Sequence, residues 1–246
     1  MDHKASFQLS RKSLRVQCEV LGLPLNRVRM NYTGRPEVAM LERFVHSGAE
    51  IALFDEGKSI HGLLHAALMP LLYPLGVRRW GPEQKYVANG YIQVSGVSTY
   101  LYLHYGAFTE LLSDHPNLPN KMVKTVAEST TDTIHAGWSK IRSWNRDNKG
   151  FQHLSLTVSP QQMVRLYEIV TRSRLVRIMQ QLLVPPFVFG FTGWPDLTIV
   201  NDNHLSLVEV KTKDRLHHQQ IITISDMKDA AELDISVVQV IRTNVD

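Results

Sequence analysis

Acidic and basic side chains lie close together in one short segment near the carboxyl end of the 246-residue chain. Asp196 follows Pro195, and Glu209 and Lys211 lie in the apolar segment 205–212. That segment alternates as a β-strand does, so Glu209 and Lys211 share one of its faces. A carboxylate and an ammonium in an apolar strand are costly to bury unless they are paired or bind a metal. The pattern therefore indicates either an ion pair or a site for chemistry.

The chemistry that fits these side chains is metal-assisted hydrolysis. Asp196 begins the first of two predicted strands, and the turn-forming residues 201–203 predict a hairpin that brings its carboxylate near Glu209. Two close carboxylates repel each other, and a divalent cation relieves the repulsion. Oxygen ligands suit Mg²⁺ or Mn²⁺. Lys211 would then orient or deprotonate the water that the metal activates for attack on a phosphodiester.

A purely structural role fits the same residues. A Glu209–Lys211 ion pair at a strand edge, with Asp196 in a turn, needs no metal, and a bare Glu-Val-Lys is common. The combination is more specific than the tripeptide, because Pro-Asp is followed at this spacing by Glu-x-Lys. That arrangement is the signature of the PD-(D/E)XK nuclease superfamily, whose spacing is variable.

Four linked segments resemble one branch of that superfamily, the VRR-NUC domain. In chain order they are Gly193–Leu197 (Gly-Trp-Pro-Asp-Leu), Leu207–Lys211 (Leu-Val-Glu-Val-Lys), Asp214–Leu216 (Asp-Arg-Leu) and Gln220. The resemblance implies an α/β, restriction-endonuclease-like PD-(D/E)XK core, which is a small mixed sheet flanked by helices. It also implies metal-dependent hydrolysis of DNA.

The resemblance assigns roles to individual residues. It implies that Asp196 and Glu209 bind Mg²⁺ or Mn²⁺, that the Val210 carbonyl is a backbone ligand, and that Lys211 assists the attacking water. It also suggests that Gln220, one turn into the following helix, points to the active site.

An earlier segment resembles the Fanconi-associated nuclease family. Residues 54–59, Phe-Asp-Glu-Gly-Lys-Ser, precede a very apolar helix, and a similar segment of that family supplies a further metal-binding glutamate. The resemblance therefore implies that Glu56 is a catalytic metal ligand. Glu37 is a second candidate, but an acid at a helix N-terminus explains it equally well. That branch is described as monomeric, so a monomer is favoured over a dimer.

The sequence departs from the family pattern at several positions. His217 replaces a frequent Ser, Trp194 replaces the usual Leu, and the residues before Gly193 are not the common Arg-Gly-Gly. The N-terminal DNA-binding and helical-repeat domains of the Fanconi-associated nucleases do not appear in this sequence. Their recognition of flaps and 5′-phosphates is therefore not transferred to it.

Positive charge is concentrated near the amino end. The formal net charge is +4, but residues 1–35 alone carry a surplus of five positive charges, which predicts a basic N-terminal arm that could hold a polyanion such as DNA. An ordinary solvated surface explains the same charges. The candidate DNA-binding residues are Lys58, Arg142, Arg146, Arg174, Arg215, His218 and Gln220.

Other motifs are absent or incomplete. His61 and His65 have the spacing of a zinc helix but lack the intervening Glu of His-Glu-x-x-His. Cys18 is the only cysteine, which excludes an intrachain disulfide and a cysteine zinc site. The polar residues 1–8 do not resemble a signal peptide, and the most apolar stretch, 63–75, is too short to cross a membrane. We therefore expect a cytoplasmic protein without a membrane partner.

The predicted elements form one α/β domain. Helices are expected at 36–48, 60–73, 121–144 and 215–233, and a further apolar helical stripe runs from 159 to 182, with a bend. Strands are expected at 49–54, 196–200, 205–212 and 235–242. A VRR-NUC-type nuclease domain at 36–246 thus follows the basic arm at 1–35; its helical insertion covers about 76–158 and its core motifs 190–246. The segment 76–120 gives little signal beyond its aromatic content.

These features predict a DNA endonuclease that cuts branched or flap DNA in repair or processing. Two alternatives remain. The same chemistry could belong to a secreted antibacterial DNase toxin that an immunity protein neutralises. Alternatively, the chain could be a catalytically inactive DNA-binding module, although the intact set of Asp196, Glu209 and Lys211 argues against inactivity.

Overall fold

The computed structural model describes residues 3–79, 91–94, 97–100, 115–148, 157–183 and 193–243. The chain divides into two compact units. The sheet unit contains residues 1–57 and 191–246, and the helical unit contains residues 58–190. The motif segments at 54–57 and 193–220 therefore both belong to the sheet unit.

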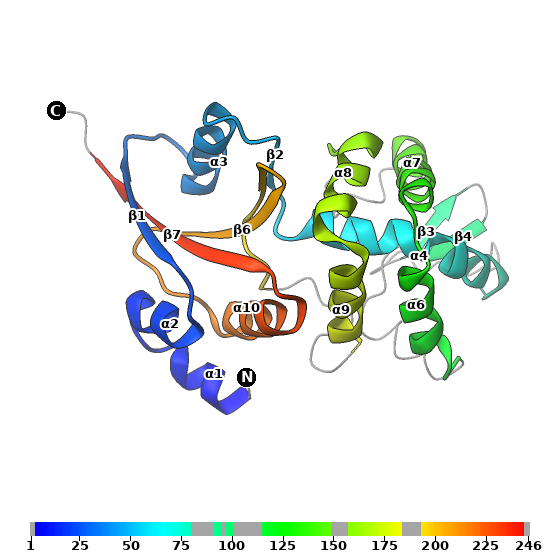
Figure 1. The fold of residues 1–246 in the computed structure, drawn as a ribbon, viewed down its shortest axis with the longest axis horizontal. Helices are drawn as coiled ribbons and strands as arrows, with labels where there is room; N and C mark the ends of the chain where they lie inside the picture. Colours follow the sequence, from blue (N-terminus) through cyan, green and yellow to red (C-terminus); the bar gives the residue numbers. More distant parts are fainter. Residues whose placement is uncertain are drawn as a thin grey trace. The chain divides into compact units, whose positions relative to one another are not determined.

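A five-stranded mixed sheet forms the centre of the sheet unit, in the order β1-β7-β6-β5-β2 (Figure 1). The parallel strands are β1 (Leu25–Met30), β7 (Asp234–Arg242) and β6 (His204–Lys211). From β6 onward the pairing is antiparallel, to β5 (Leu197–Asn201) and then to β2 (Ile51–Phe54). The fold class expected from the sequence, a small mixed sheet flanked by helices, is confirmed.

Helices cover both faces of this sheet. Helix α3 (Pro36–His46) lies on one face, and α2 (Leu14–Leu21) and α10 (His218–Ala231) lie on the other, where α1 (His3–Leu9) packs against α10 (Figure 1). The core beneath α3 is apolar because alternate strand residues point toward it. Its buried members are Met40, Leu197, Ile199, Val208, Val210, Val238 and Val240.

A tight turn sets the register of the β5–β6 hairpin. Asp202 and Asn203 both have positive φ, 49° and 62°, as a two-residue type I′ turn requires. The turn pairs Leu197 with Val208. The next residues outward, Asp196 and Glu209, therefore lie side by side at the open end of the hairpin, as the sequence predicts.

The helical unit contains five helices among its described residues. They are α4 (Lys58–Arg79), α6 (Leu118–Ala127), α7 (Thr131–Asn148), α8 (Pro160–Val170) and α9 (Arg172–Leu182), joined by the two-stranded sheet of β3 (Tyr91–Val94) and β4 (Val97–Tyr100). Helices α4 and α7 pack closely, and a Cβ at Gly137 would lie 2.3 Å from the Ala66 carbonyl oxygen. Trp138 is fully buried and donates its indole N–H to the Val158 carbonyl at 2.9 Å.

One helical expectation needs correction. The single helix expected at 121–144 is two helices, because the chain leaves α6 at Glu128 and Ser129 bonds Tyr167 before α7 begins. The bend expected within the stripe at 159–182 falls at Thr171, whose φ of 66° separates α8 from α9.

The amino-terminal segment is part of the sheet unit. Residues 3–30, in the expected basic arm, form α1, α2 and β1, and β1 pairs with β7 along its whole length. The domain boundaries at 35 and 36 stay a prediction, and much of the expected insertion lies outside the described residues. Among those that are described, no helix is long and apolar enough to cross a membrane.

Candidate active site

The Asp196 carboxylate is fixed by backbone groups of two neighbouring strands. Its Oδ2 accepts a hydrogen bond from the Val210 N–H at 2.8 Å. Its own carbonyl oxygen accepts from the N–H groups of Asp55 (3.0 Å) and Glu56 (3.2 Å), just after β2. Asp196 therefore connects β6 to the loop that carries Glu56, and small movements of either strand would displace its carboxylate.

Glu209 and Lys211 lie beside Asp196 on the face of β6 opposite the α3 core. Glu209 is fully buried and Lys211 is 7% exposed. The Lys211 Nζ contacts Glu209 Oε1 at 2.6 Å, so the ion pair expected from the sequence does form. Glu209 Oε2 is also buried but has no hydrogen-bond partner within the described part of the chain. An ion pair alone therefore leaves half of this carboxylate unsatisfied.

Gln220 links the catalytic strand to α10. Its Nε2 donates to Glu209 Oε1, and its Oε1 accepts from the His217 N–H at 3.0 Å as part of a capping box. Gln220 therefore occupies the first turn of α10 and points to Glu209, and its part in catalysis stays a prediction. Its amide bonds Oε1 and leaves Oε2 without a partner.

Burial strongly perturbs the two carboxyl groups. Removal from water raises the pKa of Asp196 to about 6, although the hydrogen bond from Val210 and the charge of Lys211 oppose this increase. Burial and the Asp196 charge raise the pKa of Glu209 to about 7, even though Lys211 opposes this change. Burial alone would lower the pKa of Lys211, but the Glu209 carboxylate raises it above its usual value. The lysine is therefore held as a cation.

Two further acids approach Asp196. The charges of Glu37, in the first turn of α3, and of Glu56 both act on it and oppose its ionisation. Glu56 is exposed and has a left-handed φ of 51°. In the described residues, however, no three His, Cys, Asp or Glu side chains are grouped closely enough to hold a metal by themselves.

The donor set still fits a hard divalent cation. Two repelling carboxylates and the unsatisfied Glu209 Oε2 offer oxygen atoms that gain from a nearby cation. Mg²⁺ in particular retains several waters and needs few protein ligands. Glu56, on an exposed left-handed turn beside Asp196, could approach such an ion after a side-chain rotation.

Asp55 is a site residue that the sequence reasoning missed. It is buried, and its Oδ1 accepts from Thr198 Oγ1 at 2.9 Å and from the Gly57 N–H at 3.3 Å. These bonds hold the turn that carries Glu56 against β5. An Asp two residues before a glycine is a known turn former, which is the signal that could have identified it.

Glycine is required at the first position of the Gly-Trp-Pro-Asp segment. Gly193 has φ 84°, and a Cβ there would lie 2.5 Å from the Gln219 carbonyl oxygen. Trp194 is buried and packs against Gly57, whose Cβ would lie 2.6 Å from the indole ring. The segment therefore fits tightly between α10 and the Glu56 turn, which positions Asp196.

The candidate DNA-binding residues are placed differently. Arg215 is exposed, and its Nη1 donates to the Arg11 carbonyl at 2.7 Å. His218 packs its ring against His3, with 4.3 Å between ring centroids. Lys58, Arg142 and Arg174 belong to the helical unit, and the Arg146 side chain lies outside the described residues.

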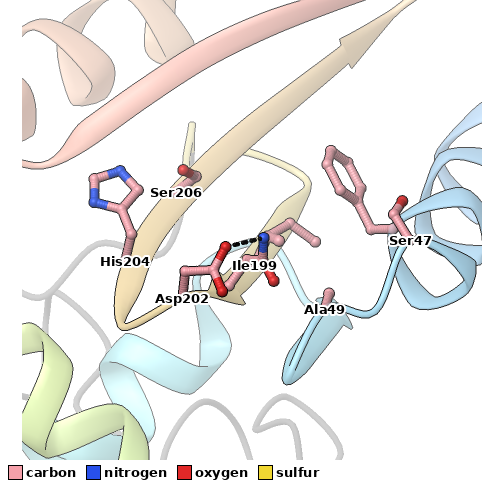
Figure 2. Close-up of a pocket in the computed structure, with 8 residues that line it drawn as sticks. Ser47, Ala49, Ile199, Asp202, His204 and Ser206 are labelled. Atoms are coloured by element: carbon pink, nitrogen blue, oxygen red, sulfur yellow. Dashed lines mark hydrogen bonds between the residues drawn. The ribbon is translucent and has the colours of Figure 1, made fainter.

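A cavity of about 360 Å³ lies at the opposite end of the β5–β6 hairpin from Asp196. Figure 2 shows Asp202, His204 and Ser206 at its turn end and Ser47 and Ala49 beside it. Both His204 Nε2 and Ser206 Oγ bond Asp234 Oδ2, at 2.9 and 3.0 Å. This cavity contains none of the predicted catalytic residues.

Comparison with known proteins supports the resemblance seen in the sequence. Residues 139–241 match the family model described as the VRR-NUC domain. The segments at 193–220 that carry the resemblance lie inside this match, so the predicted VRR-NUC relationship is confirmed. No curated protein matches the sequence.

Two similar solved structures are described as paFAN1 bound to 5′-flap DNA with a gap. The complex with a 2-nucleotide flap has a TM-score of 0.56 and 16% sequence identity, over 95% of this chain and 42% of the other. The complex with a 1-nucleotide flap has a TM-score of 0.55 and 17% identity, over 99% and 46%. This chain thus spans less than half the length of these proteins, and the likeness shows a shared fold.

The raised carboxyl pKa values predict that the metal-free protein loses stability as the pH rises. Between about pH 4 and 7 the folded protein retains protons that the unfolded chain releases, so the free energy of unfolding falls over that range. Asp196→Asn removes one charge and its repulsion of Glu209. We expect the free energy of unfolding of the variant to equal that of the wild type near pH 4. At pH 8 it should be about 1–2 kcal/mol higher than that of the wild type.

Urea unfolding with chelator present, from pH 4 to pH 8, measures this difference. Glu42→Gln, which removes an exposed carboxylate of α3, is the control and should follow the wild-type curve. If the free energy of unfolding of the wild type stays constant or rises between pH 4 and 7, the pKa values of Asp196 and Glu209 are not raised in the folded protein.

Gly193→Ala should lower both stability and activity. The new methyl group would meet the Gln219 carbonyl and strain the left-handed backbone, which costs about 2–3 kcal/mol. Gly34→Ala is the matched control, because Gly34 has a similar φ of 81° but nothing within 4 Å of its Cβ position. The free energy of unfolding of Gly34→Ala should fall by only about 1 kcal/mol. Equal losses for both variants in urea unfolding would contradict the close contact between Gly193 and the Gln219 carbonyl.

Proposed function

We propose that this protein is a divalent-metal-dependent endonuclease that hydrolyses DNA phosphodiester bonds. The observation that carries the proposal is the buried Asp196–Glu209 carboxylate pair, with an unsatisfied Glu209 Oε2 and with Lys211 on the same face. The VRR-NUC match over the same residues supports it. A structural ion pair would not need Asp196 beside a second buried acid.

Each residue has a distinct task in this proposal. Asp196, Glu209 and the Val210 carbonyl would hold Mg²⁺ or Mn²⁺, with Glu56 completing the site. The ion would supply positive charge to the scissile phosphate, which is commonly the largest single contribution to such catalysis. Lys211 stays protonated beside Glu209, so it donates hydrogen bonds that orient the attacking water and oppose negative charge on the phosphate.

Gln220 has a positioning task. Its amide holds Glu209 Oε1 while the same side chain caps α10, so the orientation of the carboxylate is tied to the start of the helix. The Glu209 Oε2 atom is then left toward the cation. The pair Gln220 and Lys211 fixes one oxygen so that the other can bind metal.

The substrate is proposed to be branched DNA. The similar structures hold 5′-flap DNA, and this chain shares their fold over nearly all of its length. Cutting of flap or branched DNA in repair or processing, by a monomer, is therefore part of the proposal. The chain spans less than half of those proteins, so its choice among DNA structures must be measured.

The activity is tested with plasmid, 5′-flap and four-way-junction DNA in Mg²⁺, in Mn²⁺ and in chelator. We expect cleavage with either ion and none in chelator. Asp196→Ala and Lys211→Met should each lower kcat at least about 100-fold, because they remove a metal ligand and the cation beside it. Glu56→Gln should weaken activity about 10-fold and shift the metal concentration needed upward.

The matched controls remove charge outside the site. Glu42→Gln on α3 and His204→Ala at the distant cavity should keep wild-type activity. Cleavage that survives both Asp196→Ala and chelator would overturn the proposed chemistry. Binding of all three DNAs without any cleavage would instead identify an inactive DNA-binding module.

A further inference from the structure

An irregular segment connects the catalytic strand to the helix whose first turn holds Glu209. Residues 212–217 form this linking segment, between the end of β6 at Lys211 and the start of α10 at His218. Gln220, in the first turn of α10, points back to Glu209 and donates to its Oε1. The path of the linking segment therefore determines whether Gln220 reaches the carboxylate.

Gln17 of α2 supplies hydrogen-bond partners to the backbone of this segment. Its side chain is fully buried. Its Oε1 accepts from the Leu216 N–H at 2.8 Å, and its Nε2 donates to the Leu216 carbonyl oxygen at 3.0 Å. The amide thus exchanges two hydrogen bonds with one residue, as a paired residue of a neighbouring strand does. Both backbone groups of Leu216 are buried, so they need such partners.

The amino-terminal helix α1 contacts the same region. Arg215 donates to the Arg11 carbonyl oxygen just after α1. The His218 ring packs against the rings of His3 and Phe7, with 4.3 and 5.9 Å between the ring centroids. These contacts come from the part of the chain for which the sequence predicts a basic arm, so that part also holds a segment next to the candidate active site.

The amide of Gln17 interrupts an otherwise apolar face of α2. Leu14, Cys18 and Leu21 are also buried on this helix and pack it against the rest of the sheet unit. An apolar side chain at position 17 would extend that packing, whereas a buried amide is unfavourable unless it is hydrogen bonded. The bonds to Leu216 therefore explain the glutamine better than packing does.

A continuous path of hydrogen bonds leads from Gln17 to the catalytic carboxylate. Leu216 precedes His217, whose N–H donates to Gln220 Oε1 at 3.0 Å. Gln220 Nε2 in turn donates to Glu209 Oε1. If Leu216 shifts, the capping box at His217 shifts with it, and the Gln220 amide moves away from the carboxylate. Glu209 then loses the orientation that directs its Oε2 toward a bound cation.

We propose that Gln17 is a positioning residue of the Asp196–Glu209 metal site and acts through Leu216 and Gln220. The amino-terminal helices thereby set the affinity of the site for its cation without supplying a ligand to it. This inference rests on the metal site of the proposed function and adds to it a residue outside the motifs that resemble the family. Residues that orient metal ligands commonly change metal affinity about 10–100-fold, and Gln17 acts one contact further out.

Calorimetric titration of Mn²⁺ into the full chain tests the proposal without relying on activity. Gln17→Met keeps the length of the side chain but removes its hydrogen bonds to Leu216. We expect the Kd for Mn²⁺ to rise about 5–10-fold, because Glu209 is less well oriented. Leu21→Ala is the matched control, since it loosens the same buried face of α2 and leaves the Gln17 amide in place. Its Kd should equal that of the wild type.

A double variant tests the path between the two amides. Gln220→Leu should raise the Kd by itself, and Gln17→Met/Gln220→Leu should raise it no further, because both amides act on one carboxylate oxygen. Three results would overturn the proposal: an unchanged Kd for Gln17→Met, an equal rise for Leu21→Ala, or independent effects that multiply in the double variant.

Hydrogen exchange of the wild-type protein tests the same coupling without any substitution. Coupling is reciprocal, so if the Gln17–Leu216 contact strengthens cation binding, the cation strengthens that contact by the same factor. Saturating Mg²⁺ should therefore slow exchange of the Leu216 amide about 5–10-fold. The buried Met163 amide of α8, which bonds the Ser159 carbonyl in the helical unit, should not change. Equal exchange rates at Leu216 with and without Mg²⁺ would overturn the proposal even if Gln17→Met fails to fold.

Failure of the nuclease proposal gives a different pattern. If the wild type binds neither Mn²⁺ nor Mg²⁺, both proposals are wrong. If it binds the ion but cleaves no DNA, only the nuclease proposal is wrong, and the Kd values still decide the role of Gln17. If it binds the ion and cleaves DNA while Gln17→Met has an unchanged Kd, only the positioning role is wrong.

Discussion

The hydrogen bond from the Val210 N–H to the Asp196 carboxylate sets two acids side by side at the open end of the β5–β6 hairpin. Both carboxyl groups are shielded from water, and each opposes the ionisation of the other, so the sheet holds an arrangement that is unfavourable without a cation. Lys211 compensates one oxygen of Glu209 and leaves the second without a partner. Burying two carboxylates in this way lowers the stability of the folded protein. Functional sites typically retain such local strain, which favourable contacts elsewhere in the fold offset.

Contacts around the site offset the loss of stability that the buried carboxylates cause. Beneath α3 the strands bury an apolar core, and on the opposite face Gln220, Gln17 and the capping box connect α10 and α2 to the end of β6. Gly193 allows the chain to approach α10 closely enough to place Asp196. The candidate site is thus held from both faces of one sheet.

Local patterns in the sequence were sufficient for the hairpin and its site. Alternation placed Glu209 and Lys211 on one face, and the turn residues at 201–203 placed Asp196 beside them. Contacts between distant segments were not predictable in this way. The pairing of β1 with β7 and the role of Asp55 both depend on residues far apart in the chain. The break between α6 and α7 likewise depends on Ser129 meeting Tyr167, which no local propensity reveals.

The central claim is that the Asp196–Glu209 pair binds a divalent cation in exchange for protons. Calorimetric titration of Mn²⁺ into the protein, in buffers of different ionisation enthalpy, measures the protons released. Because the pKa values of Asp196 and Glu209 are raised to about 6 and about 7, we predict release of about one proton at pH 6.5 and much less at pH 8.5. Asp196→Asn should reduce the release, because it removes one titrating carboxyl group and the charge that helps to raise the pKa of Glu209. Mn²⁺ binding without proton release at pH 6.5, or no binding at all, would contradict the account.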